Sequence, residues 1–126
     1  MAKTITTTNK APGAIGPYSQ GIKANGFLFV SGQLGLIPET GVFAEGGVTG
    51  QTRQSLTNVK HVLEEAGSGL EKVVKVTVFL KDMKDFAAMN AVYSEFFTED
   101  FPARSAVQVV ALPKDGLVEI EVIAVA

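Results

Sequence analysis

The sequence predicts an α+β domain in which two helices pack on one face of a mainly antiparallel sheet. Strand-like and helix-like segments alternate in the order ββ, α, β, α, ββ, a pattern that favours helices on one side of a sheet. The 126 residues are expected to form a single domain, 1–126, large enough to bury a core. Hydrophobic residues make up 46% and charged residues only 19%, against about 25% charged in ordinary soluble domains. We therefore expect identical chains to cover the other face of the sheet.

An N-terminal β-hairpin is predicted from two strand-like runs, SQGIKA and FLFVSGQ, on either side of Asn25-Gly26. This dipeptide tolerates the positive φ angles of a two-residue turn. The tetrapeptide PETG, from Pro38 to Gly41, predicts a further turn. The first residues, MAKTITTTNKAPG, lack the apolar run of a signal peptide, so we expect a soluble, cytoplasmic protein.

A first helix is predicted over residues 48–66 and a buried strand over residues 73–80. In the helix, apolar side chains recur at helical spacing, and Gly67 follows where a C-cap prefers glycine. The strand VVKVTVFL is rich in β-branched residues. Alternation places Val74 and every second residue after it on one face, and Val73 and every second residue after it on the other. Because the second face is half polar, we expect it to be only partly buried.

A second helix is predicted from Asp82, which can cap its N-terminus, through Phe97. Asn90 falls near the middle of the apolar stripe of this helix, where an unpaired amide is costly. Two interpretations stay open from the residues alone: Asn90 bonds to a neighbouring loop backbone, or it serves a site. The stripe consists of Met83, Phe86, Tyr93 and Phe97.

The C-terminal part of the chain predicts a second antiparallel hairpin, with RSAVQVVAL and LVEIEVIAVA flanking PKDG. Pairing Leu112 with Leu117 would place Arg104 about six residues along the ladder from Glu119, roughly 20 Å away. Two side chains at that separation cannot touch within one chain. If Arg104 and Glu119 serve one pocket, we expect that pocket to lie between subunits.

Arg104, in the run FPARSAV, needs a partner because its guanidinium stays charged and presents a rigid fork of N–H donors. Spacing alone leaves two interpretations open: an ion pair with Glu99 or Asp100, or a carboxylate that the protein binds. His61 has no second His or Cys at ligand spacing, so we expect it to be a residue of the helix flank.

The composition argues against several classes of function. A net charge of −2 and the absence of any run of Lys or Arg are unlike a nucleic-acid-binding protein. Zero cysteines and one histidine remove most zinc and iron sites, so that only a metal held by carboxylates stays open. No apolar run has the length of a membrane span. We expect neither a nucleic-acid nor a membrane partner.

Five stretches of the chain carry a family resemblance. They are AIGPYSQG (14–21), VSGQLG (30–35), QTRQSLTNVKHVLEEAG (51–67), FPARSAV (101–107) and ALPKDGLVEIE (111–121). In this order, and over essentially the whole chain, they resemble the YjgF/RidA family, the reactive-intermediate deaminases. The resemblance implies a chorismate-mutase-like fold and a homotrimer whose three sheets form a central barrel, with three sites in clefts between subunits.

The resemblance also implies an activity: a 2-iminobutanoate/2-iminopropanoate deaminase that hydrolyses reactive enamine and imine intermediates, such as 2-aminoacrylate, to 2-keto acids and ammonia. The family's site residues fall on Tyr18, Ser31, Asn90, Arg104 and Glu119. Arg104 is expected to bind the substrate carboxylate and Glu119 to deprotonate the attacking water. The other three line and orient the pocket. No metal or cofactor is expected, since a protonated imine is already an electrophile.

The resemblance leaves alternatives open at two positions, Ala106 and Glu121, and for the function of the protein. Many family members carry a cysteine two residues after the arginine, where this chain has Ala106; any role for a thiol is absent, and substrate preference can differ. Glu121 is the candidate if Glu119 is not the residue that positions water. The alternative function is a non-catalytic trimer that binds small carboxylates or acts as a chaperone-like scaffold. Ribonuclease activity, also described in the family, fits poorly with the absence of a basic stripe.

Overall fold

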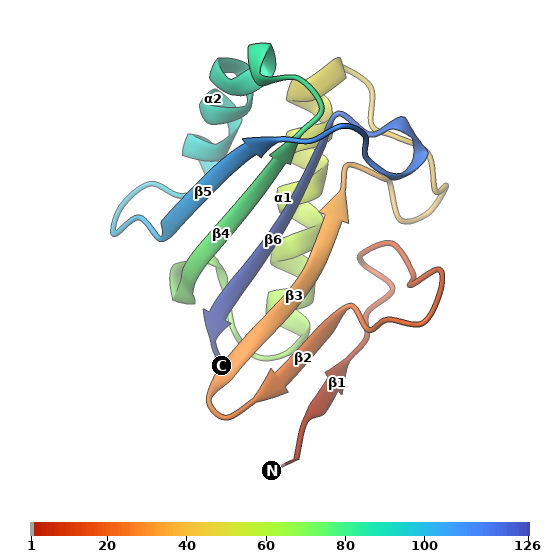
Figure 1. The fold of residues 1–126 in the computed structure, drawn as a ribbon. Helices are drawn as coiled ribbons and strands as arrows, with labels where there is room; N and C mark the ends of the chain where they lie inside the picture. Colours follow the sequence, from red (N-terminus) through yellow and green to blue (C-terminus); the bar gives the residue numbers. More distant parts are fainter. Residues whose placement is uncertain (1) are drawn as a thin grey trace.

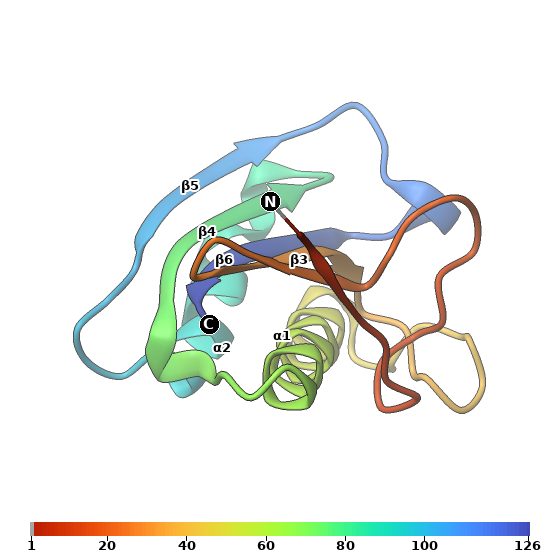
Figure 2. The ribbon, with the colours of Figure 1, turned by 90° about the horizontal axis from the view of Figure 1, so that it is seen from below.

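The computed structural model describes residues 2–126, which fold into one six-stranded sheet with two helices on one face (Figure 1 and Figure 2). The strands lie in the spatial order β1-β2-β3-β6-β4-β5. They are β1 (Thr4–Thr6), β2 (Gly21–Ala24), β3 (Phe27–Leu34), β4 (Val73–Leu80), β5 (Ala103–Gln108) and β6 (Val118–Val125). The helices are α1 (Gly47–Glu65) and α2 (Phe86–Phe96), with 3-10 turns at Leu70–Lys72, Met83–Asp85 and Pro113–Asp115. The predicted α+β class is confirmed.

The predicted N-terminal hairpin is confirmed, since β2 and β3 pair antiparallel around Asn25 and Gly26. These two residues have φ angles of 51° and 84°, the left-handed conformation that such a turn requires. The predicted turn at residues 38–41 is also present, closed by a hydrogen bond from the amide of Gly41 to the carbonyl of Ile37. Strand β1, which pairs with β2 at the edge of the sheet, was not predicted.

Helix α1 matches the predicted helix within one residue at each end. Its apolar stripe faces the sheet, and Leu56, Val59 and Val62 have no exposed surface. Gly67 follows the helix with a φ of 81°, and its amide donates to the carbonyl of Glu64. The predicted glycine cap is therefore confirmed.

Buried polar side chains on α1 fasten the helix to the end of β3. The Ser55 Oγ donates to the carbonyl of Gln33 at 2.6 Å, and the Asn58 Nδ2 donates to the carbonyl of Leu36 at 2.9 Å. Both side chains are fully buried, so each bond also satisfies a polar group that has left water. These bonds hold the segment after β3 against the helix.

Strand β4 occupies the predicted residues, but its first two side chains lie on the opposite faces from those predicted. Val73 is 6% exposed, whereas Val74 is 43% exposed. The register between β4 and β6 shifts between Val73 and Lys75, so a bulge reverses the alternation at the start of the strand. From Val76 onward, every second residue is fully buried as predicted.

Asp82 begins the second helical segment, as predicted. Its Oδ1 accepts a hydrogen bond of 2.9 Å from the amide of Lys84, at the start of a 3-10 turn that runs directly into α2. The amide of Phe97 donates to the carbonyl of Tyr93 and closes the last turn. In the described part of the chain, neither α1 nor α2 is long and apolar enough to cross a membrane.

The predicted C-terminal hairpin is wrong. Strands β5 and β6 do not pair, because β4 lies between them, parallel to β5 and antiparallel to β6. Helix α2 supplies the long crossover that two parallel neighbours require. The pairing of Leu112 with Leu117 therefore does not form, and the separation of roughly 20 Å derived from it does not apply. The first three residues of PKDG form the 3-10 turn Pro113–Asp115 in the connection between β5 and β6, and Gly116 follows it.

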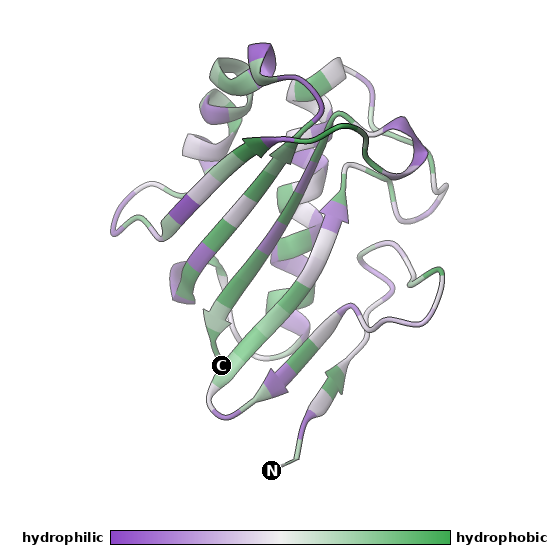
Figure 3. Cartoon of the chain, in the orientation of Figure 1, coloured by the Kyte–Doolittle hydropathy of each residue, from purple (hydrophilic) through white to green (hydrophobic). Residues whose placement is uncertain are grey.

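The sheet face opposite the helices carries apolar side chains that no part of residues 2–126 covers. Figure 3 shows the apolar stretches of the strands in green. Phe27 and Phe29 on β3 are 42% and 44% exposed, and Val107 and Val125 on β5 and β6 are 42% and 44% exposed. Contact between this apolar surface and water is unfavourable for the free energy of the folded chain. That identical chains cover it as a trimer with a central barrel stays a prediction.

Gly35 permits the close packing of α1 on the segment after β3. A Cβ at this position would lie 2.5 Å from both the Cα and the carbonyl oxygen of Gln51, backbone atoms that move only if the helix moves. We expect Gly35→Ala to lower the free energy of unfolding by about 1–3 kcal/mol, measured by urea denaturation. Gly13→Ala is the control, because its Cβ would meet nothing within 4 Å. Equal stability of the two variants would contradict the prediction.

Candidate functional site

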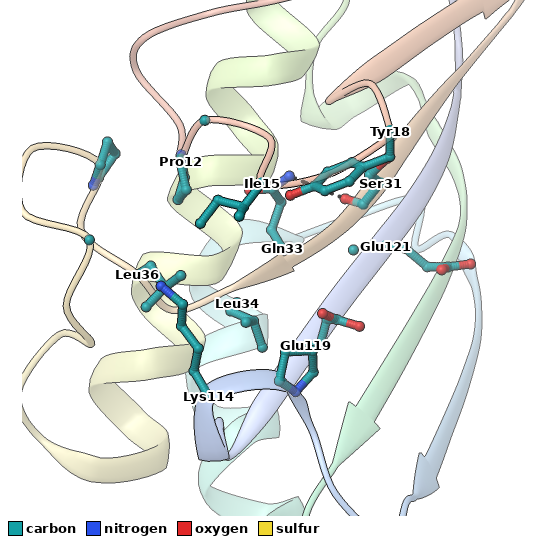
Figure 4. Close-up of a pocket in the computed structure, with 15 residues that line it drawn as sticks. Pro12, Ile15, Tyr18, Ser31, Gln33, Leu34, Leu36, Lys114, Glu119 and Glu121 are labelled. Carbon is teal, nitrogen blue, oxygen red and sulfur yellow. Dashed lines mark hydrogen bonds between the residues drawn. The ribbon is translucent and has the colours of Figure 1, made fainter.

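A cavity of about 620 Å³ lies between the loop before β2, the end of β3 and the start of β6 (Figure 4). Tyr18, Ser31 and Glu119, three of the predicted site residues, line this cavity. Much of the remaining wall is apolar, so the few polar groups face a site that is poor in competing hydrogen-bond partners. The apolar lining consists of Pro12, Ile15, Leu34, Leu36, Pro38 and Pro113.

The segment that carries Tyr18 is held by a buried glutamine. The Gln20 Nε2 donates to the carbonyl of Thr8 at 3.0 Å, and its Oε1 accepts from the amide of the same residue at 2.7 Å. The Ser31 Oγ donates to the carbonyl of Ser19 at 2.5 Å. Because this bond uses the only proton of the hydroxyl, Ser31 fixes the backbone beside Tyr18. Tyr18 itself is 49% exposed and reaches over the cavity (Figure 4).

The partly buried carboxyl group of Glu119, which lines the cavity, has a shifted pKa. Burial raises the pKa of its carboxyl group, and the neighbouring charge of Glu121 raises that pKa further. Gly32 gives the side chain room, since a Cβ there would lie 2.8 Å from the Glu119 Cδ. This glycine sits where the register of β3 against β6 shifts, between Val30 and Gln33. A carboxylate with a raised pKa beside a cavity is suited to accept a proton.

Arg104 lies at a second cavity, of about 420 Å³, between α2 and the start of β5. Its Nη1 donates a hydrogen bond of 2.7 Å to the Asn90 Oδ1. The guanidinium carbon is 4.7 Å from the centroid of the Tyr93 ring and 5.5 Å from that of the Phe86 ring. Burial raises the pKa of the Tyr93 hydroxyl, while the charge of Arg104 acts in the opposite direction. The phenol is therefore neutral beside the guanidinium.

For Asn90 and Arg104, the structure shows which of the partners considered in the sequence analysis are present within residues 2–126. The side-chain oxygen of Asn90 accepts from Arg104, not from a loop backbone. In residues 2–126 the ion pairs join Arg53 to Glu95, Lys81 to Asp115 and Lys84 to Asp82. Arg104 thus has no ion pair with Glu99 or Asp100. His61 lies on the flank of α1, where its Nδ1 is 2.7 Å from the carbonyl oxygen of Lys10.

One chain brings the predicted site residues together in two separate groups. Tyr18, Ser31 and Glu119 share the larger cavity, whereas Asn90 and Arg104 share the smaller one. We call these the carboxylate half-site, after Glu119, and the guanidinium half-site, after Arg104. Glu121 also lines the larger cavity but is exposed.

Strand β4 sets the separation between the two half-sites. Arg104 pairs with Val76 and Glu119 pairs with Phe79. Cross-strand partners point to the same face, so Arg104 lies on the helix side of the sheet and Glu119 on the open side. The two residues differ by about 10 Å along the strands and about 10 Å across them. The two side chains are therefore separated within one chain, as expected, but the separation comes from the pairing with β4 and not from the predicted hairpin. That they meet between subunits stays a prediction.

Two contacts of the site were missed by sequence reasoning. Phe86 and Tyr93 were assigned to the apolar stripe of α2, yet both rings contact Arg104. The available signal was an aromatic residue four positions before Asn90 and another three positions after it, on one face of a helix. Gly32 was likewise not recognised as the residue that leaves space for Glu119. Within residues 2–126, no three His, Asp or Glu side chains gather in a way that could hold a metal ion.

Comparison with known proteins identifies the family. The family model described as endoribonuclease L-PSP matches residues 8–126. The chain belongs to the YjgF/RidA, or Rid, family. A RutC family protein of Pyrococcus abyssi is 56% identical to this Rid protein over 98% of each chain. The 2-iminobutanoate/2-iminopropanoate deaminase of Salmonella typhimurium is 54% identical over 99% of this chain and 98% of its own.

The fold of this Rid protein is also that of solved family members. Escherichia coli TdcF, whose structure contains bound serine, superposes with a TM-score of 0.93 at 46% identity and covers 98% of each chain. Relatives named as deaminases, from bacteria and from plants, place this Rid protein in a family of enzymes. The predicted family is therefore confirmed.

Gly32 offers a direct test of the carboxylate half-site. In Gly32→Ala, the new methyl group overlaps the end of the Glu119 side chain, which can rotate away, whereas in Gly35→Ala it overlaps backbone. We expect Gly32→Ala to change the free energy of unfolding by less than about 1 kcal/mol and to move the carboxylate, as observed in a crystal structure of the variant. A carboxylate that stays in place, or a stability loss as large as that of Gly35→Ala, would contradict this account of the half-site.

Proposed function

We propose that this Rid protein is a cofactor-independent deaminase that hydrolyses 2-imino acids, and their enamine tautomers such as 2-aminoacrylate, to 2-keto acids and ammonia. The observation that carries the proposal is the state of Arg104, a partly buried guanidinium bonded to the neutral amide of Asn90 and to no acid within residues 2–126. Such a group favours binding of a small carboxylate. The deaminase names of several relatives and the serine bound to TdcF support the same choice.

The proposal requires that two copies of the chain complete each site. The guanidinium half-site of one protomer would meet the carboxylate half-site of its neighbour, because Arg104 and Glu119 lie on opposite faces of one sheet. The uncovered apolar face, with Phe29 and Val107 among its residues, supports an assembly through the sheets. A homotrimer around a central barrel satisfies both requirements.

The chemistry needs only groups that the chain contains. Arg104 binds the substrate carboxylate and holds the imine carbon in one place. Glu119, as carboxylate, takes a proton from water while the water oxygen bonds to the imine carbon and the C=N π electrons move to nitrogen. With the substrate as the protonated imine, this addition gives a neutral carbinolamine. The proton then passes from Glu119 to the amino nitrogen, and the C–N bond breaks as the hydroxyl gives its remaining proton to the Glu119 carboxylate and its O–H electrons form the C=O bond. Ammonia and the keto acid leave, and Glu119 releases the proton to solvent. Tyr18, Ser31 and Asn90 shape and orient the site.

Glu119 is the better candidate for this proton transfer than Glu121. Both side chains line the larger cavity, but Glu121 is exposed, whereas Glu119 is partly buried and burial raises the pKa of its carboxyl group. Ala106 stands where many relatives have cysteine, and no step of the proposed reaction involves a thiol.

The activity test generates 2-aminoacrylate with a dehydratase and follows keto-acid release above the spontaneous rate. We expect Arg104→Ala to lower kcat/KM by about 10- to 100-fold, and Arg104→Lys to lose most of the same amount because an ammonium lacks the two-pronged fork. Glu119→Gln should lower kcat by about 100-fold or more. Arg53→Ala, which removes an exposed arginine paired with Glu95, is the control and should keep full activity.

Two outcomes of this test would reject the proposal. Equal keto-acid release with wild type, with Arg104→Ala and without protein would exclude deaminase activity. Carboxylate binding of full affinity in Glu119→Gln, with no turnover by wild type, would favour a non-catalytic carboxylate-binding trimer.

The pH dependence of the reaction tests the role of Glu119 separately. Hydrolysis needs the carboxylate form, so the rate falls as the pH drops through the pKa of Glu119. The charge of Glu121 contributes to the raised pKa of Glu119. Glu121→Gln removes this repulsion and should move the acidic limb of the kcat profile to lower pH. An unchanged limb, or one that moves equally in the control Glu71→Gln, would contradict the assignment.

A further inference from the structure

The guanidinium of Arg104 packs against one face of helix α2. Phe86, Asn90 and Tyr93 are spaced by four and three residues, so their side chains lie on the same face of the helix. The guanidinium carbon lies 5.5 Å and 4.7 Å from the two ring centroids, and the Asn90 Oδ1 accepts from Nη1 at 2.7 Å. Three side chains from consecutive turns thus contact a single charged group on the neighbouring strand.

These contacts use different parts of the guanidinium. An aromatic face attracts a cation through its quadrupole and stacks on the flat side of a guanidinium, whereas the N–H donors lie in the plane, at its edge. An acidic partner would have occupied two of these donors. Asn90 accepts from one N–H and adds no negative charge, and Arg104 has no ion pair within residues 2–126. The positive charge is therefore stabilised while the other N–H donors stay available for a ligand.

We propose that Phe86 and Tyr93 form an aromatic clamp that holds the Arg104 guanidinium in one orientation, with its free donor edge turned to the incoming carboxylate. The two rings are positioning residues that act through Arg104. This inference rests on the proposed function, because it assigns the clamp to carboxylate binding. It explains how Arg104, which has no acid paired to it within residues 2–126, keeps its long side chain in a fixed place.

Removing the hydroxyl group of Tyr93 distinguishes a role of the aromatic ring from a role of the O–H group. The hydroxyl is buried and has no hydrogen-bond partner within residues 2–126, so the ring alone contacts the guanidinium. Tyr93→Phe therefore keeps the clamp and removes only an unsatisfied polar group. Tyr93→Leu keeps an apolar side chain in the core but removes the aromatic face.

The test measures the dissociation constant of 2-oxobutanoate by calorimetry, together with KM and kcat for the imine. We expect Tyr93→Leu and Phe86→Leu each to weaken binding and to raise KM by about 3- to 30-fold. The value of kcat should change little, because the clamp acts on the carboxylate equally in the ground state and the transition state. Tyr93→Phe should bind 2-oxobutanoate as wild type does.

Val92→Ala is the matched control for lost packing. Val92 is a buried neighbour of Tyr93 on the same helix, 1% exposed, and it does not touch the guanidinium in the contacts described above. We expect this variant to lose stability while its dissociation constant for 2-oxobutanoate stays that of wild type. Wild-type affinity in both Tyr93→Leu and Phe86→Leu would overturn the clamp, as would an equal loss of affinity in Val92→Ala or in Tyr93→Phe.

A measurement without ligand keeps the clamp separate from the proposed function. The rings shift the NMR resonances of the Arg104 side chain by ring currents, and this shift should persist in Tyr93→Phe and largely vanish in Tyr93→Leu. Failure of wild type to bind 2-oxobutanoate, or equal binding by Arg104→Ala, would reject carboxylate binding at this site and with it the assigned purpose of the clamp. A ring-current shift that is the same in Tyr93→Leu and wild type would reject the clamp itself.

Discussion

The alternation of side chains along β6 is the constraint on which both the core and the site depend. Val118, Ile120, Val122 and Ala124 are at most 2% exposed and face the helices. Glu119 is therefore fixed on the opposite face. Strand β6 pairs with β3 on one side and with β4 on the other. A shift of its register by one residue would therefore move all four apolar side chains from the core to the opposite face of the sheet. The position of the carboxylate is thus held by the burial energy of its neighbours.

Local patterns in the sequence were sufficient for most elements of this fold. Asn25-Gly26 specified the first hairpin through its backbone preferences, and Gly67 marked the end of α1. These features depend on a few adjacent residues, so a short window contains the necessary information. The same holds for β4, whose boundaries follow from one β-branched run.

The order of strands in the sheet could not be read in this way. PKDG between two apolar runs is typical of a hairpin, but β4 takes the place between β5 and β6. That choice depends on how α2 crosses the sheet and on which strand buries the most surface, both of which involve residues far apart in sequence. The bulge that places Val73 and Val74 on the opposite faces from those predicted could not be predicted for a related reason. It depends on how β4 pairs with β6.

The candidate site was only partly accessible to sequence reasoning. Resemblance to the family marked Arg104 and Asn90, but their mutual hydrogen bond, and the rings that flank the guanidinium, required the fold to be known. Phe86 and Tyr93 look like ordinary core residues because the same aromatic ring can bury apolar surface and face a cation. Once placed, they stabilise the charge of the arginine without consuming its donors.

The position of the two charged groups on opposite sides of one sheet has a genetic consequence. In the proposed assembly, each reaction centre takes its arginine and its glutamate from different polypeptides. Mixed oligomers of two inactive mutants, one without the arginine and one without the glutamate, would then contain some centres that inherited both groups intact. Two defective alleles could in this way restore part of the activity that neither produces alone.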